Sequence, residues 1–261
     1  HFGEEPPLTG ARGAGAVFLG RCCMACRFCQ NSQISQADAG EEVSAQELGQ
    51  VFLDLQRQGC HNVDLVSPTH IVPQVLEAVL WAAERGLRLP LVYNAGGYDR
   101  VETLRLLDGV VDIYLPDAKY ADDEAALRLS DAPGYVAINR GALREMFRQA
   151  GPLETDEQGV ARRGLIVRHL VLPGGLPGTR QVLRFIAEEL SPEVPVSLMA
   201  QYTPRHRAAE LPEVNRALLP EEYEEALAAL DEAGIENAFV QALESQGTGL
   251  PDFERDRPFE W

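Results

Sequence analysis

Four of the five cysteines in this chain lie within eight residues, in the stretch GRCCMACRFCQN at positions 20–31. Cys22, Cys26 and Cys29 have the spacing C-x3-C-x2-C. Three thiolates on a short loop can bind three irons of a 4Fe-4S cluster. The fourth iron then has no protein ligand and can bind a substrate or cofactor, as the open position of a catalytic zinc does. The spacing therefore predicts a reactive iron-sulfur centre.

Two other metal sites are compatible with the same stretch. Cys23, Cys26 and Cys29 could form a closed electron-transfer cluster with Cys60 as fourth ligand. The same three thiolates could bind zinc with His61 or Cys60, although zinc sites usually contain two C-x2-C halves and the second half is missing here. Cys60 is expected at the amino end of a strand, away from the loop, as a small buried residue. Thiols this closely spaced are a poor disulfide framework, because disulfides join distant segments.

The composition is that of a globular protein, with 261 residues, 45% hydrophobic and 24% charged. The net charge of −17 argues against a nucleic-acid partner, because phosphate contacts require a basic surface. No apolar run approaches the roughly 18 residues of a membrane-spanning helix, and the start lacks the pattern of a signal peptide. We therefore expect a cytoplasmic protein without a membrane partner. The first residue is His1 rather than Met, so we expect the natural N-terminus to lie upstream.

Short β-rich runs alternate with amphipathic helical patterns along the chain. The clearest helix starts at the S-x-x-E capping box of Ser44 and Glu47 and ends at Gly59. Strands are expected at 16–19, 62–67, 89–94, 111–115, 164–172, 194–200 and 237–242. Further helices are expected at 73–84, 100–107, 122–130, 140–150, 181–190 and 221–233.

This alternation predicts an α/β fold with a parallel sheet and right-handed crossovers. The units could curl into an incomplete barrel or lie as an open doubly wound sheet, and in both architectures ligands bind at the carboxyl ends of the strands. Segments 151–163 and 201–219 are expected to be loops, and 246–261 an extended tail on the surface.

Polar residues follow the expected strands and should therefore converge. They are Ser67, Thr69, Asn94, Asp117, Lys119 and Tyr202. Thr69 could instead cap the following helix, and Asp117 with Lys119 could be a surface ion pair. Arg168 lies inside an apolar strand, where a charge is costly unless it is paired. Its guanidinium could bind a carboxylate with two hydrogen bonds or pair with Asp117. The neighbouring His169 should point to the other face and pack there.

The motif C-x3-C-x-aromatic-C, formed here by Cys22, Cys26, Phe28 and Cys29, resembles the signature of radical S-adenosylmethionine (radical SAM) enzymes. The later motifs SPTH, YNAGGYD, YLPDAKY, VRHLVLPGG and MAQYTP are similar to the branch related to pyruvate formate-lyase activating enzyme. The resemblance implies a partial (βα)6 barrel over 1–245, followed by the tail at 246–261.

The activity that the resemblance implies is reductive cleavage of S-adenosylmethionine, whose amine and carboxylate chelate the open iron. The resulting 5′-deoxyadenosyl radical abstracts hydrogen from a substrate. The substrate could be a glycyl radical protein, a peptide or a small molecule. A flavodoxin or ferredoxin is the expected electron donor. Arg12, Arg21 and Arg27 are expected to form its basic docking patch.

The resemblance also implies roles for residues of the cofactor site. Phe28 would lie against the adenine, Lys119 would counter the methionine carboxylate, and Arg168 would bind that carboxylate. Ser67 and Thr69 stand where the activating enzymes carry a Gly-Gly-Glu turn, so hydroxyls or backbone carbonyls would have to meet the amine. The remaining expected cofactor-binding residues are Asn94, Asp117 and Tyr202.

Overall fold

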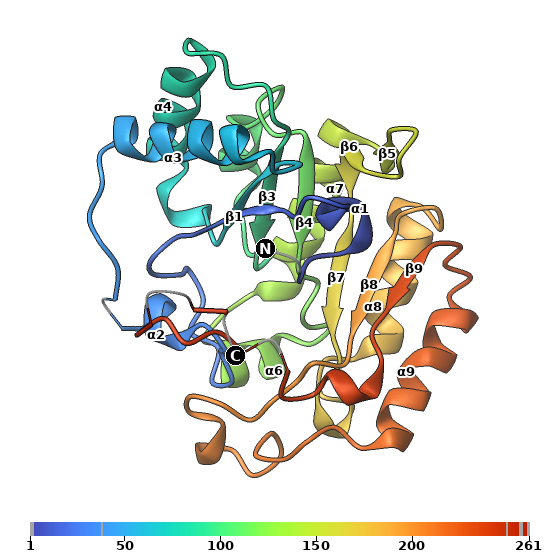
Figure 1. Ribbon diagram of the computed structural model, residues 1–261. Helices are drawn as coiled ribbons and strands as arrows, with labels where there is room; N and C mark the ends of the chain where they lie inside the picture. Colours follow the sequence, from blue (N-terminus) through green and yellow to red (C-terminus); the bar gives the residue numbers. More distant parts are fainter. Residues whose placement is uncertain (1–2, 38, 249, 256–257, 260–261) are drawn as a thin grey trace.

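The computed structural model describes residues 3–37, 39–248, 250–255 and 258–259, and strands alternate with helices through most of them (Figure 1). The strands are β1 (Gly15–Phe18), β2 (Val63–Val66), β3 (Leu91–Ala95), β4 (Ile113–Pro116), β5 (Glu154–Thr155), β6 (Ala161–Leu165), β7 (Val167–Leu170), β8 (Val196–Met199) and β9 (Ala238–Val240). The helices are α1 (Pro6–Thr9), α2 (Ser32–Ser35), α3 (Ala45–Gln58), α4 (Val72–Ala83), α5 (Val101–Arg105), α6 (Asp123–Ser130), α7 (Tyr135–Ala150), α8 (Thr179–Phe185) and α9 (Pro220–Glu232). A π-helical turn over Ile186–Leu190 extends α8.

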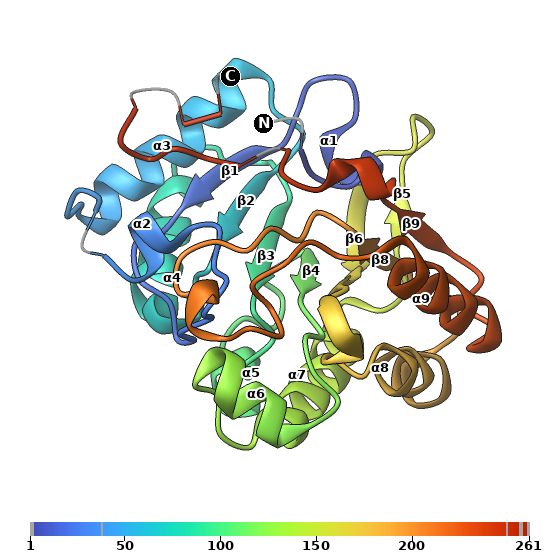
Figure 2. The same ribbon diagram turned by 90° about the horizontal axis from the view of Figure 1, so that it is seen from below.

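The parallel strands pair in the order in which they occur along the chain. One sheet has the order β1-β2-β3-β4-β6-β5 and the other the order β7-β8-β9. A parallel bridge between Asp117 and Arg168 joins β4 to β7 across the two sheets. Figure 2 shows the strands as an arc with helices on its outer side, and the N-terminal segment and the described part of the tail on its open side. The predicted partial barrel is confirmed.

The single strand expected at 164–172 is instead two strands. β6 pairs with β4, whereas β7 pairs with β8, and the ladder is interrupted between them at Ile166. Gly164 has φ +127°, and a Cβ there would lie 2.5 Å from the Pro152 carbonyl oxygen. The apolar pattern alone does not reveal this positive φ or the close approach of the Pro152 carbonyl.

Other boundaries also differ from expectation. Helix α7 begins at Tyr135 rather than at residue 140, and the expected loop at 151–163 contains β5 and the first residues of β6, which pair as a hairpin. The capping box at α3 is confirmed, because Ser44 Oγ accepts from Glu47 N at 3.2 Å and the Glu47 carboxylate accepts from Ser44 N at 2.7 Å. Gly59 ends α3 in the left-handed conformation.

The interior of the barrel is apolar near the amino ends of the strands and polar near their carboxyl ends. The buried residues of the apolar end include Leu8 of α1, Val92, Ile113 and Ile166. On the outer face, α3 and α4 cover β2, and Phe52 of α3 lies in the same buried cluster as Leu65 of β2. The space left near the carboxyl ends is therefore where polar side chains can meet a ligand.

The described part of the tail packs against the start of the barrel. The ring of Phe253 lies 5.3 Å from that of Phe18 at the end of β1, and Gln33 donates to the Asp252 carboxylate at 3.2 Å. Within those described residues beyond 246 there is no helix or strand. No helix among the described residues has the length and apolar character needed to cross a membrane.

Candidate functional site

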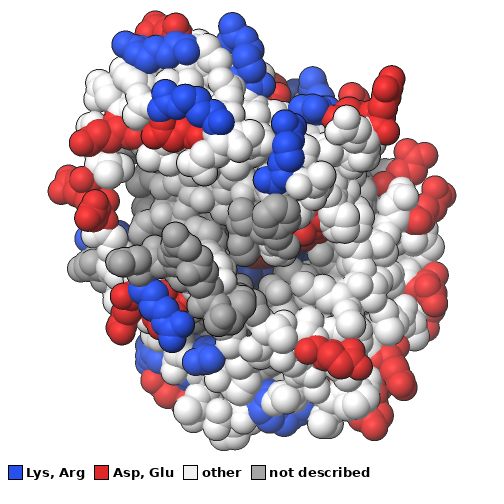
Figure 3. Space-filling view, in the orientation of Figure 1, with Lys and Arg blue, Asp and Glu red and all other residues white. Residues whose placement is uncertain are grey.

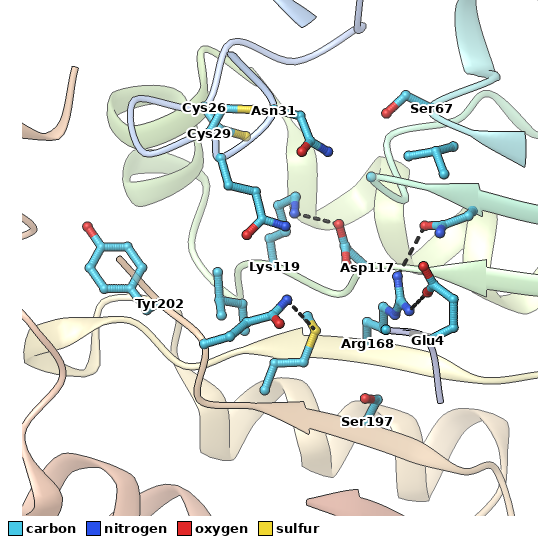
Figure 4. A pocket seen from close by; sticks show the side chains of 18 of the residues that line it. Glu4, Cys26, Cys29, Asn31, Ser67, Asp117, Lys119, Arg168, Ser197 and Tyr202 are labelled. Carbon is cyan, nitrogen blue, oxygen red and sulfur yellow. Dashed lines mark hydrogen bonds and ion pairs between the residues drawn. The ribbon is translucent and has the colours of Figure 1, made fainter. Parts of the chain in front are cut away.

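A cavity of about 640 Å³ opens at the carboxyl ends of the strands. In the orientation of Figure 1 it appears as a hollow near the middle of the molecular surface (Figure 3). Residues at or after the ends of β1, β2, β3, β4, β7 and β8 line it, as the strand-end rule predicts. Figure 4 shows how the side chains from these separate elements point into one space.

The cysteine loop forms one wall of this cavity. Cys22, Cys26 and Cys29 line it, whereas the Cys23 thiol points toward the Tyr98 carbonyl oxygen, 3.9 Å away. The loop is fixed to the end of α6 by backbone hydrogen bonds from Ala25 N to Ser130 O (2.9 Å) and from Arg27 N to Leu129 O (2.8 Å). The three spaced cysteines thus share one cavity wall, and the adjacent fourth does not.

Each of the three thiols has a different hydrogen-bond partner. Ser130 Oγ donates to Cys26 Sγ at 3.1 Å, Met24 N donates to Cys22 Sγ at 3.5 Å, and Cys29 Sγ lies 3.2 Å from Ser35 Oγ. Such hydrogen bonds orient sulfur ligands and affect the reduction potential of an iron-sulfur cluster.

The pKa values of the thiols respond to this environment. The hydrogen bond from Cys23 lowers the pKa of Cys22 to about 6. Burial raises the pKa of Cys26 to about 12 and raises the pKa of Cys29 as well, while the charge of Lys119 opposes both shifts. Buried thiols of this kind become thiolates when a cation binds them.

The loop fits a cubane cluster better than a single ion. Among the described residues, no three Cys, His, Asp or Glu side chains converge as ligands of one ion. A 4Fe-4S cluster does not need that convergence, because each thiolate binds a different iron. Cys60 and His61 do not line the cavity, and His61 is hydrogen-bonded to Arg12 near the start of β2. The alternative zinc site and closed cluster therefore lack their fourth ligand.

Asp117 and Lys119 follow β4 and form an ion pair inside the cavity, with Lys119 Nζ 2.5 Å from Asp117 Oδ2. Burial alone would lower the pKa of Lys119, but the Asp117 carboxylate and the Cys26 thiol raise it above its usual value. The hydroxyl of Tyr135 accepts from Lys119 N at 2.9 Å and fixes the turn. Lys119 is therefore a fixed positive charge beside the cysteine wall (Figure 4).

Arg168 also faces the cavity, but its partners differ from both expectations. Its Nε and Nη2 atoms donate to Glu5 at 2.8 and 2.7 Å, and Nη2 also pairs with Glu4. Nη1 donates to Asn94 Oδ1 at 3.4 Å. The guanidinium edge that would grip a methionine carboxylate is thus occupied by Glu5 of the N-terminal segment. Asp117, the alternative partner, is paired with Lys119 instead.

The other expected residues separate into two groups. Phe28, Ser67, Asn94 and Tyr202 line the cavity. The Phe28 and Tyr202 rings meet edge to face at 5.6 Å, and the Tyr202 hydroxyl donates to the Val214 carbonyl. Thr69 is not among the lining residues, and its hydroxyl lies 3.5 Å from the Tyr93 hydroxyl.

The Thr69 side chain also gives no capping hydrogen bond to α4. The alternative of a helix cap is therefore wrong, and contact of Thr69 with the cofactor stays a prediction. Thr69 belongs to a buried polar group with Tyr93 and Asp99.

Sequence reasoning missed Glu4, Glu5 and Ser197, all of which line the cavity. The only available signal was the acidic pair directly before Pro6, together with the need of Arg168 for a partner. His169 behaves as expected, since it is fully buried on the other face of β7 between Ala118 O and Thr179 Oγ1.

No protein-family model matches the chain. The chain is 32% identical over 237 residues to the uncharacterized protein MJ0674 of Methanocaldococcus jannaschii, a match that covers 87% of this chain and 64% of that protein.

Two solved structures are similar in fold. SuiB of Streptococcus suis bound to S-adenosylmethionine is 10% identical and matches over 87% of this chain and 50% of that chain, with a TM-score of 0.58. SuiB has also been solved bound to its precursor peptide SuiA. Methylornithine synthase (PylB) is 16% identical and matches over 94% of this chain and 77% of that chain, with a TM-score of 0.55. The fold is therefore a partial α/β barrel like those of SuiB and methylornithine synthase.

Proposed function

We propose that this protein is a radical SAM enzyme. The observation that carries the proposal is the placement of Cys22, Cys26 and Cys29 on one cavity wall, with no further Cys or His among the described residues that line the cavity. This arrangement suits a cluster with one iron open to a ligand. A 4Fe-4S cluster held there by the three thiolates would supply the electron for reductive cleavage of S-adenosylmethionine, and the cleaved cofactor would then abstract hydrogen from the substrate.

The residues of the chain position the cofactor. Lys119 offers a buried positive charge to the methionine carboxylate. Ser67 offers its hydroxyl and backbone carbonyl to the amine, and it has φ +62° at the turn after β2. The rings of Phe28 and Tyr202 form an apolar wall suited to adenine. Together they exclude water from the place where the radical forms.

For the substrate, the motifs similar to pyruvate formate-lyase activating enzyme favour a glycyl radical protein. The likeness to SuiB, which binds a precursor peptide, favours a peptide instead. To distinguish the two substrate classes, the protein is incubated with a deuterated glycyl radical protein or with a deuterated peptide. Transfer of deuterium into 5′-deoxyadenosine identifies the substrate.

For the electron donor we propose a flavodoxin or ferredoxin that docks near the cysteine loop. The expected patch of three arginines needs correction, because Arg12 is bonded to His61 near the start of β2, away from the loop. Arg27 is paired with Glu210 at 3.0 Å. Arg21 and Arg27 are therefore the only members of that set near the loop.

The decisive experiment is anaerobic reconstitution followed by reduction with dithionite in the presence of S-adenosylmethionine. We expect about four irons per chain and formation of 5′-deoxyadenosine. Cys26→Ala should abolish both, whereas Cys60→Ala should change neither. The rival function is a non-catalytic electron carrier. It requires a cluster that is lost in Cys60→Ala and no 5′-deoxyadenosine from the wild type.

A further inference from the structure

Two buried hydroxyl groups connect the turn after β4 to the thiol of Cys26. Ser130 Oγ donates to Cys26 Sγ at 3.1 Å, and the Tyr120 hydroxyl lies 2.6 Å from Ser130 Oγ. Ser130 has no exposed surface, and Tyr120 is 2% exposed. Neither is among the described residues that line the cavity. We define Tyr120, Ser130 and Cys26 as the hydroxyl chain.

The direction of the hydrogen bonds in the hydroxyl chain follows from the chemistry of Cys26. A thiolate that binds iron has no proton and can only accept a hydrogen bond, so Ser130 is its donor. A serine hydroxyl has a single proton, and the Ser130 oxygen is then left to accept from the Tyr120 hydroxyl. The positive ends of both O–H dipoles therefore point toward the Cys26 sulfur.

The fold holds both hydroxyls in place without help from a ligand. Lys119 and Tyr120 are neighbours in the turn after β4. Lys119 lines the cavity, whereas the ring of Tyr120 packs edge to face on that of Tyr135 at 5.4 Å. Ser130 is the last residue of α6, and its carbonyl accepts from Ala25 N of the cysteine loop at 2.9 Å. The donor is thus fixed to the same loop that carries its acceptor.

The surroundings of the hydroxyl chain strengthen its hydrogen bonds. Tyr120 belongs to a buried apolar cluster with Ala126 and Leu129 of α6, and Cys26 packs against this cluster. A hydrogen bond is electrostatically stronger in such a medium than in water, and consecutive hydrogen bonds polarise one another.

The partners of the other two thiols differ from those of Cys26. Cys22 accepts from the backbone N–H of Met24 at the longer distance of 3.5 Å. Ser35, which lies 3.2 Å from Cys29 Sγ, lines the cavity and can meet solvent or a ligand there. The hydroxyl chain is therefore a source of positive dipole that the contents of the cavity do not reach.

Such a source acts on the addition of an electron to a cluster. Reduction adds negative charge to an iron-sulfur centre, and hydrogen bonds to its sulfurs and the net charge nearby help to set its potential. A donor aimed at the Cys26 sulfur favours the reduced state. The net charge of −17 on the chain acts in the opposite direction, because negative charge opposes the addition of an electron.

We propose that Tyr120 and Ser130 are positioning residues that raise the reduction potential of the cluster bound by the cysteine loop. Ser130 acts directly on the Cys26 sulfur, and Tyr120 acts through Ser130. This inference rests on the cluster of the proposed function. It does not depend on cleavage of S-adenosylmethionine or on the identity of the substrate.

The test is a redox titration of the reconstituted full chain without S-adenosylmethionine, in which electron paramagnetic resonance measures the reduced cluster. At a fixed applied potential, Ser130→Ala should lower the ratio of reduced to oxidised cluster about tenfold, which is a fall of about 59 mV for a one-electron couple. Tyr120→Phe should lower this ratio about threefold, because Ser130 still donates to the sulfur but is no longer polarised by a second hydroxyl.

The double variant distinguishes a chain from two independent effects. Because Tyr120 acts through Ser130, adding Tyr120→Phe to Ser130→Ala should cause no further change in the potential. Tyr114→Phe is the matched control, since the Tyr114 hydroxyl is buried and donates to Gln149 rather than to a cysteine of the loop. It should keep the wild-type potential.

If Ser130→Ala does not retain about four irons per chain, Tyr120→Phe decides alone, because it removes a single oxygen atom that touches no cluster ligand. A lowered potential in this variant supports the inference, and the wild-type potential overturns it. Where the double variant can be measured, a further fall on adding Tyr120→Phe to Ser130→Ala would also overturn it, since Tyr120 would then act independently of Ser130.

Formation of 5′-deoxyadenosine by the wild type, measured separately with S-adenosylmethionine present, tests the proposed function. Cleavage of the cofactor together with unchanged potentials in the variants rejects the role of the hydroxyl chain alone. The expected potentials without cleavage reject the catalytic function alone. A wild-type protein that binds no cluster rejects both.

Discussion

Cys22 and Cys23 are neighbours in the sequence, yet only Cys22 lines the cavity. We predict that Cys23→Ala retains the visible absorbance and iron content of the reconstituted cluster. Cys22→Ala, Cys26→Ala and Cys29→Ala should each lose both, because a missing thiolate leaves an iron without its ligand. The outcome that contradicts this assignment is loss of the cluster in Cys23→Ala together with its retention in Cys22→Ala.

Lys119 lines the cavity, and its positive charge acts on all three thiols of the cysteine wall. We predict that it binds the cofactor carboxylate. Lys119→Met should weaken S-adenosylmethionine binding about 30-fold or more, because removal of one partner of a buried charge pair costs roughly 2–5 kcal/mol. Titration of the cofactor into the anaerobic protein measures the change. Arg148→Met is the control, since Arg148 pairs with Asp108 and Glu145 at the surface. An unchanged dissociation constant in Lys119→Met would place the carboxylate elsewhere.

At the scale of single residues, the sequence predicted which side chains face the cavity better than it predicted their partners. A charge inside an apolar strand requires compensation, which identified Arg168 as a residue of interest. The compensation comes from Glu4 and Glu5, and Glu5 lies 163 residues earlier. No local pattern links positions so far apart. The contact of the Thr69 hydroxyl with Tyr93 could not be predicted for a similar reason, because it depends on how β3 lies beside the turn after β2.

At the scale of elements, ligands bind at the carboxyl ends of parallel strands. This rule was sufficient to predict that residues from separate parts of the chain line one cavity. Periodicity located most strands and helices because the helices cover one face of the sheet and the strands are buried on both. It did not separate β6 from β7, since the apolar residues 164–167 continue from the end of β6 into the start of β7 and give no sign of the change of pairing partner.

Gly97 follows β3 in the turn that faces the Asp117 backbone. Its φ is +68°, and a Cβ there would lie 2.1 Å from Asp117 O and 2.3 Å from Asn139 Nδ2. We predict that Gly97→Ala lowers the free energy of unfolding by about 3 kcal/mol, from backbone strain and steric overlap. The shift in the urea midpoint measures it.

Gly141→Ala is the matched control for Gly97→Ala. Gly141 lies inside α7, and its added Cβ would meet only Val101 Cγ2, at the ordinary distance of 3.6 Å. That substitution should stabilise the protein by roughly 0.5–1 kcal/mol, because alanine is the better helix former. Equal effects of the two substitutions would mean that the turn after β3 is not constrained as described.

At the scale of the whole molecule, His169 connects β7 to two other elements. Its Nδ1 donates to Ala118 O at 2.6 Å after β4, and its Nε2 lies 2.9 Å from Thr179 Oγ1 at the start of α8. Burial lowers the pKa of His169 to about 4, from a usual value of 6.5. The unfolded chain therefore binds a proton between these values that the folded protein does not bind.

Because the unfolded state binds the extra proton, we predict that the free energy of unfolding falls as the pH is lowered from about 6.5 to 4. The contribution of His169 amounts to roughly 3 kcal/mol and does not grow below pH 4, where both states are protonated. His169→Gln keeps a donor for Ala118 O and should remove this contribution. Urea unfolding of both proteins across this pH range isolates it as a difference. Parallel pH dependences would contradict it.

The contact between the N-terminal glutamates and Arg168 has a consequence for the order of folding. Glu4 and Glu5 leave the ribosome well before their partner Arg168, which lies 164 and 163 residues later in the chain. Closing so long a loop is slow relative to forming the neighbouring strand pairs. The segment should therefore dock late, after the transition state for folding. Removal of its contact with Arg168 should then accelerate unfolding and leave the folding rate nearly unchanged. The barrel then assembles around an open interior, and its last contact determines how long the native protein persists rather than how quickly it forms.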